Sequence, residues 1–172
     1  EDPPRERTMR VYYDYIKKRA RVDIDEGYEV EKTYIRRYDL ENEYMIRYST
    51  IKDCKRSYLG ETMPFPQIPE VALYKGSEVI NGIESNYYVY IEEDTSIHMY
   101  FSKLDGGPVK LIQESIENNV SIHLMTFEYS NTKIGSIDEE IFVLPPEHSH
   151  SSCERHIGGF PYLHVFHYFV RF

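Results

Sequence analysis

Hydrophobic and polar residues alternate with period two along most of the chain. In the stretch Val22-Asp23-Ile24, for example, two apolar side chains flank a charged one. Such alternation is typical of a β-strand that buries one face. In the first part of the chain we predict strands at residues 11–16, 21–25, 28–37 and 43–48. Short turns such as Glu26-Gly27 would join them into an antiparallel meander.

Three prolines then interrupt the alternation between residues 60 and 69, namely Pro64, Pro66 and Pro69. Proline has no backbone N–H to donate, so we predict a crossing loop here. Further strands are predicted at residues 71–75, 77–81, 86–92, 96–102, 109–115 and 120–129, followed by a single helical turn at 138–142. Many short strands with almost no helix predict a mainly β sandwich or a barrel-like sheet.

The composition changes after Pro146. Residues 147–153 are rich in Ser and His, and residues 158–172 are densely aromatic. We therefore predict an antiparallel β domain over 1–146 and a segment over 147–172 that packs on it or begins a truncated element. An exposed aromatic tail of this kind would promote aggregation.

Charge and composition exclude some classes of partner. The 172 residues carry a net charge of −9, which disfavours nucleic acid and anionic membranes. The apolar runs are shorter than a transmembrane span, so we expect no transmembrane segment. The chain has 17 tyrosines and no tryptophan. The tyrosines indicate either an aromatic-walled ligand groove or, as the commoner case, an ordinary sheet with wet faces.

Two cysteines, Cys54 and Cys153, leave two alternatives open. They form a disulfide or remain free thiols, and neither has the sequence context of a papain-like nucleophile. A disulfide closing a loop of about 100 residues would stabilise the fold by about 4.7 kcal/mol, less any strain. Asn119-Val120-Ser121 is an N-glycosylation sequon at a predicted turn.

The side chains with reactive groups have sequence contexts that favour structural roles. His148, His150, Cys153 and His156 are chemically suited to zinc, but their spacing matches no standard site. His98 and His123 fall within predicted strands, where packed histidines are common. We therefore expect no catalytic residue, no metal site and no cofactor within these residues.

Four fragments, taken together, resemble a known family. They are Tyr13-Asp14-Tyr15 with the following Arg19 to Asp23, then Met63 to Pro66, Gly82 to Tyr88, and Ile137 to Pro145. In this order they resemble the LolA-like domains of ependymin-related secreted proteins. They resemble still more the non-catalytic N-terminal domain of counting-factor-associated papain-family cysteine proteases, in which a Cys likewise precedes Gly-Phe-Pro.

The resemblance implies a strongly curved antiparallel sheet, or half-open barrel, with an apolar concave face. It implies a secreted or lysosomal binding domain for a lipid or another apolar small molecule. The alternative that it leaves open is a regulatory or structural domain of a precursor whose papain-like catalytic domain lies outside this chain. Combined with the strand alternation, it predicts these ligand-binding residues: Tyr13, Tyr88, Tyr90, Met99, Phe101, Leu111 and Leu124.

Overall fold

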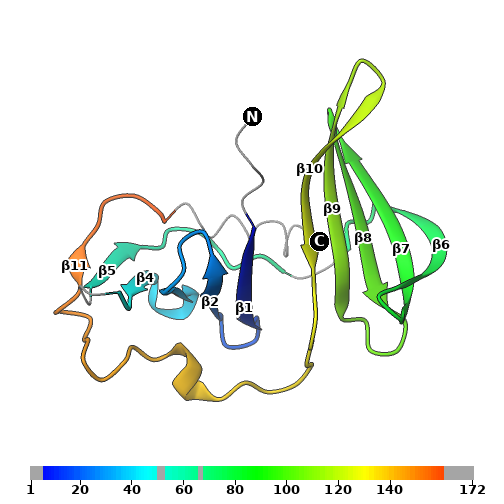
Figure 1. Ribbon diagram of the computed structural model, residues 1–172. Helices are drawn as coiled ribbons and strands as arrows, with labels where there is room; N and C mark the ends of the chain where they lie inside the picture. Colours follow the sequence, from blue (N-terminus) through cyan, green and yellow to red (C-terminus); the bar gives the residue numbers. More distant parts are fainter. Residues whose placement is uncertain (1–5, 50–52, 66–67, 161–172) are drawn as a thin grey trace. The chain divides into compact units, whose positions relative to one another are not determined.

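The computed structural model describes residues 6–49, 53–65 and 68–160. Over these residues the chain is mainly β, as the alternation predicted, and its only helical elements are two short 3-10 turns. Strands form two sheets that belong to two compact units, Glu1–Gln67 with Ser136–Phe172, and Ile68–Gly135 (Figure 1). Pro66 and residues 161–172 of the predicted aromatic segment lie outside the described residues. Neither described 3-10 turn has the length and apolar character needed to cross a membrane.

The first unit contains a six-stranded sheet in the order β1-β2-β3-β4-β5-β11. Neighbouring strands are antiparallel except for β11, which lies parallel to β5. The elements are β1 (Arg7–Asp14), β2 (Arg19–Gly27), β3 (Lys32–Arg37), η1 (Tyr38–Leu40), β4 (Asn42–Arg47), β5 (Asp53–Tyr58), η2 (Glu139–Phe142) and β11 (Glu154–Arg155).

Both faces of this sheet are covered. On one face, Val22 and Tyr34 belong to a core that Met63 and Phe160 complete from outside the sheet. On the other face, Ile35 and Ile46 pack in a second core that contains both cysteines. The alternating strand pattern thus supplies two buried layers on one sheet, because segments distant in sequence cover each side.

Residues 136–155, called here the closing segment, are held to the second face by three arginines and a disulfide. Arg21 donates to the carbonyl of Ile141 (2.7 Å), and Arg56 donates to that of His150 (3.0 Å). Arg37 donates to the Phe142 carbonyl (3.4 Å). Of the two alternatives left open for the cysteines, the structure has the Cys54–Cys153 disulfide. The predicted helical turn is present as η2.

The second unit is a five-stranded antiparallel sheet in the order β10-β9-β8-β7-β6. Its strands are β6 (Leu73–Ile80), β7 (Ile83–Glu92), β8 (Thr95–Ser102), β9 (Pro108–Glu117) and β10 (Val120–Glu128). The two short strands predicted at 71–75 and 77–81 are one strand, β6. A β-bulge at Lys75 interrupts its alternation, and Gly76 adopts a φ of +113°, which glycine tolerates best.

Candidate functional site

A row of apolar side chains crosses the middle of the five-stranded sheet. Tyr88 on β7 is directly opposite Met99 on β8, and Met99 is directly opposite Leu111 on β9. Residues that face each other across neighbouring strands point to the same side of the sheet. The register therefore brings together three of the predicted ligand-binding residues.

The same face extends to further aromatic residues. Tyr90 and Phe101 each lie two positions from a member of the row, so they share its face. Tyr74 on β6 is opposite Tyr88, and their ring centroids are 5.3 Å apart. The Tyr88 and Phe101 rings are 6.2 Å apart in an edge-to-face arrangement. We call Tyr74, Tyr88, Tyr90, Met99, Phe101 and Leu111 the aromatic face.

Burial varies across the aromatic face. Met99 is fully buried and Leu111 is 3% exposed, whereas Tyr88, Tyr90 and Phe101 are only partly buried. Tyr74, on the edge strand, is 57% exposed. The aromatic face therefore has an apolar floor at its centre and accessible aromatic rings toward β6. Rings of this kind offer a large contact area at a low cost in side-chain entropy.

Two predicted ligand-binding residues do not belong to this arrangement. Tyr13 lies on β1 in the other unit, where it packs against the first core and its hydroxyl donates to the carbonyl of Pro64. Burial raises the pKa of this hydroxyl. Leu124 is the extra residue of a β-bulge in β10 and is 52% exposed. Strand alternation alone did not reveal this bulge, nor did it reveal Tyr74 as a partner of Tyr88.

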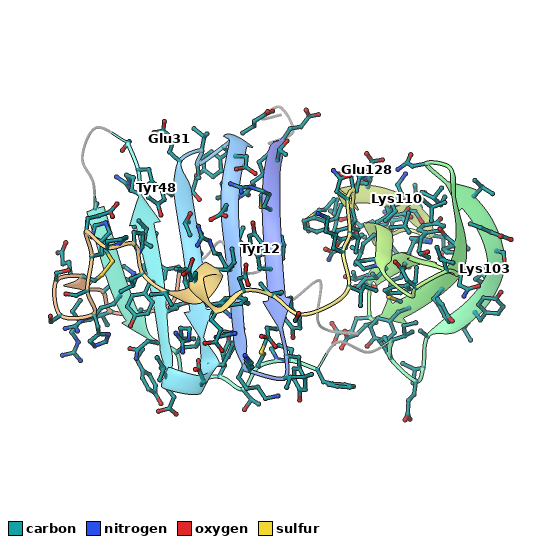
Figure 2. The ribbon with its side chains drawn as sticks, turned by 90° about the horizontal axis from the view of Figure 1, so that it is seen from below. Tyr12, Glu31, Tyr48, Lys103, Lys110 and Glu128 are labelled. Carbon is teal, nitrogen blue, oxygen red and sulfur yellow. A yellow bond between two sulfur atoms is a disulfide. The ribbon has the colours of Figure 1, made fainter. Side chains whose placement is uncertain are left out.

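The opposite face of the same sheet carries a polar cluster beside buried apolar side chains such as Val89. There the Tyr87 hydroxyl lies 2.5 Å from Nδ1 of His98, and Nε2 of His98 lies 2.7 Å from a carboxylate oxygen of Glu114. Lys110 and Glu128 form an ion pair across β9 and β10 at 3.7 Å (Figure 2). These side-chain contacts join β7, β8, β9 and β10.

The geometry around His98 differs from that of a Ser–His–acid triad. Ser96 and Glu114 both contact Nε2 of His98, at 3.0 and 2.7 Å, whereas a triad places the nucleophile and the acid on opposite ring nitrogens. Burial raises the pKa of the Tyr87 hydroxyl, and it raises that of Tyr100 to about 12. Both hydroxyls are therefore protonated at neutral pH. The contacts of His98 connect β7, β8 and β9.

The histidine-rich loop is engaged in other contacts. Cys153 is in the disulfide, and Nδ1 of His150 lies 2.7 Å from the Tyr44 hydroxyl. His156 stacks on Phe160 with ring centroids 5.0 Å apart. Within residues 6–49, 53–65 and 68–160, no group of three or more His, Cys, Asp or Glu side chains is arranged to hold a metal ion.

The buried apolar floor and the accessible rings toward β6 thus make the aromatic face the candidate functional site. Comparison with known proteins gives no match to a family model and none to a curated protein.

Proposed function

We propose that this chain is a non-catalytic, secreted or lysosomal binding domain that holds an apolar small molecule against the aromatic face. In this proposal the five-stranded sheet is a strongly curved, half-open LolA-like sheet, and the aromatic face is its concave side. The ligand is a lipid or another molecule with an extended hydrocarbon portion.

The observation that carries the proposal is the register of β6 to β9. It gathers Tyr74, Tyr88, Met99 and Leu111 into one continuous row across four strands. The partly exposed rings leave apolar surface that a hydrocarbon chain would remove from water. Each buried methylene group contributes about 0.8 kcal/mol to such binding. The disulfide supports the secretory route, because disulfides persist mainly in oxidising compartments.

The proposal is tested by titrating the purified chain with 11-(dansylamino)undecanoic acid and following dansyl fluorescence. We expect saturable binding that weakens about tenfold in Phe101→Ser, which corresponds to a loss of about 1.4 kcal/mol. Tyr74→Ser should also weaken binding of the probe. Because Tyr74 is 57% exposed, this second variant perturbs the packed interior little.

The matched control is Ile91→Ser. Ile91 lies on β7, is 59% exposed, and points to the face opposite the aromatic face, since it is three positions from Tyr88. It should bind the probe like the unmodified chain. An affinity unchanged in Phe101→Ser and Tyr74→Ser, or lowered equally in Ile91→Ser, would contradict a site on the aromatic face.

The alternative, an N-terminal regulatory or structural domain of a papain-like protease precursor, rests on the sequence resemblance. No contact among the described residues favours it over ligand binding. A full precursor sequence with a catalytic Cys motif after residue 172 would support this alternative.

A further inference from the structure

The hairpin formed by β9 and β10 extends beyond the rest of its sheet. Ser115 on β9 is opposite Thr95, the first residue of β8, and the Ile116 N–H donates to the Asp94 carbonyl (2.6 Å), so the part of the hairpin beyond this bond begins at Glu117. The hairpin ends in a two-residue turn, Asn118-Asn119, between the paired residues Glu117 and Val120. Figure 1 shows this tip reaching past the start of β8. The tip is therefore a two-stranded projection.

The outer part of β10 is apolar and exposed. Val120, Ile122 and Leu124 are 61%, 43% and 52% exposed. From Val120 to Phe127 the sequence contains no Asp, Glu, Lys, Arg, Pro or Gly. An uncharged, β-prone segment of this length on an edge strand is the usual signature of a segment that pairs with other chains.

The other edge strand of the sheet has features that oppose such pairing. β6 carries Lys75 and Glu78, and its bulge at Lys75 and Gly76 breaks the regular ladder. Charged residues and bulges are common protections of edge strands. In β10 the register shift comes only at Leu124, so residues 120–123 are regular, uncharged and exposed. This stretch of β10 has neither of the protections found in β6.

The sequon lies directly beside this unprotected stretch. Asn119 and Ser121 are both exposed, and the turn holds Asn118 and Asn119 at φ values of +51° and +61°. Such left-handed values at both central residues are typical of the tight turns that connect hairpin strands. Asn119-Val120-Ser121 is the one Asn-X-Ser/Thr triplet in the 172-residue sequence. An attached glycan would therefore start one residue before the exposed apolar strand.

We propose that Asn119 carries an N-linked glycan that covers the outer part of β10 and prevents this strand from pairing with a second copy of the chain. The glycan comes from a polyprenyl-diphosphate-linked oligosaccharide. The side-chain amide nitrogen of Asn119 forms a bond to the anomeric carbon, and the bond between that carbon and the diphosphate oxygen breaks. The amide loses one proton, and the polyprenyl diphosphate leaves.

The first test measures whether Asn119 is glycosylated in the secreted protein. The full chain is secreted from mammalian cells behind a cleavable signal, and its intact mass is measured before and after treatment with peptide N-glycosidase F. We expect one glycan, absent in Asn119→Gln and Ser121→Ala but retained in Ser121→Thr. Asn118→Gln is the matched control, because it alters the same turn and leaves the sequon intact. A secreted protein without a glycan at Asn119 would overturn the proposal.

The second test separates shielding from folding. The glycan is removed enzymatically from the already folded protein, and self-association is followed by size-exclusion chromatography with light scattering. We expect the deglycosylated protein to associate at a concentration about tenfold lower than the glycosylated form, a difference of about 1.4 kcal/mol. Ile122→Lys should restore the monomer after deglycosylation, because a charged residue on an edge strand opposes pairing.

Two results would refute the shielding role. In one, the deglycosylated chain stays monomeric over the same concentration range as the glycosylated chain. In the other, Ile122→Lys leaves the association unchanged, which would place the contact away from β10. Because both readouts concern association, they are independent of the ligand binding proposed for the aromatic face.

Discussion

Arg36 lies in the interior of the first unit between two carboxylates. Its Nε donates to Glu43 at 3.2 Å, and its Nη1 donates to Glu61 and to the Tyr38 hydroxyl. The other carboxylate oxygen of Glu43 accepts the backbone N–H of Phe160 at 3.1 Å. Glu43 is 1% exposed and Arg36 is 5% exposed. This cluster therefore joins β3, β4, the loop at Glu61 and the backbone at Phe160.

Glu43 gives the first prediction, a pH dependence of stability. Burial raises the pKa of its carboxyl above 4.5, although Arg36 and the Phe160 N–H oppose the shift. The folded protein then binds this proton more tightly than the unfolded chain does. The stabilising contribution of Glu43 should consequently fall as the pH rises from 4.5 through the folded pKa. In Glu43→Gln, urea unfolding should show a smaller loss of stability between acidic and neutral pH.

The control for this measurement is Glu41→Gln, an exposed change close to Glu43 in the sequence. It should keep the pH dependence of the unmodified chain. If Glu43→Gln and Glu41→Gln gave parallel curves of unfolding free energy against pH, Glu43 would not be the group responsible.

Gly27 gives a second prediction at this scale. It ends β2 with a φ of +88°, and a Cβ placed there would lie 2.1 Å from the carbonyl oxygen of Glu6. Gly82 has a similar φ of +77° but open space around the corresponding position. Gly82→Ala should cost about 1 kcal/mol from the backbone conformation alone. Thermal unfolding of Gly27→Ala should show a clearly larger loss, and equal losses would contradict the close approach.

At the scale of elements, the closing segment depends on long-range attachments. The disulfide joins residues 99 positions apart, and the His156 N–H donates to the Arg56 carbonyl at 2.7 Å beside the short strand β11. Because the disulfide restricts the unfolded chain, the double variant Cys54→Ala/Cys153→Ala should lose about 2–5 kcal/mol of stability. Hydrogen exchange should also become faster at His156. A double variant as stable as the unmodified chain would show that hydrogen bonds and packing hold the segment without the disulfide.

The sequence predicted most strands but missed β5. In Asp53-Cys54-Lys55-Arg56-Ser57-Tyr58, the buried positions are Cys54 and Ser57, which carry little apolar signal, and Lys55 and Arg56 between them are charged. The strand forms because its neighbours supply the partners: Ile46 lies opposite Cys54, and Cys153 is bonded to it. Such support from distant residues is not visible in a local pattern. The aromatic face shows the same limit, since alternation placed Tyr88 and Met99 on strands but only the register placed them side by side.

At the scale of the whole molecule, the division into two units also lies beyond local patterns. Alternation shows which side chains share a face of a strand, but it does not show which sheet the strand joins. A run of similar strands therefore does not reveal where one sheet ends and the next begins. The second unit, Ile68–Gly135, is inserted between the two parts of the first. It lies entirely within the loop that the Cys54–Cys153 disulfide closes.

Each unit has its own buried residues, so we predict that the two unfold as separate cooperative steps. Ile46 is fully buried in the first unit and Met99 is fully buried in the second. Substituting either by Ala should remove about 2–5 kcal/mol from the unit that contains it. Urea unfolding followed residue by residue by NMR should show Ile46→Ala lowering only the midpoint of the first unit, and Met99→Ala only that of the second. A single transition that moves as a whole in both variants would instead mean that the two sheets fold as one cooperative structure.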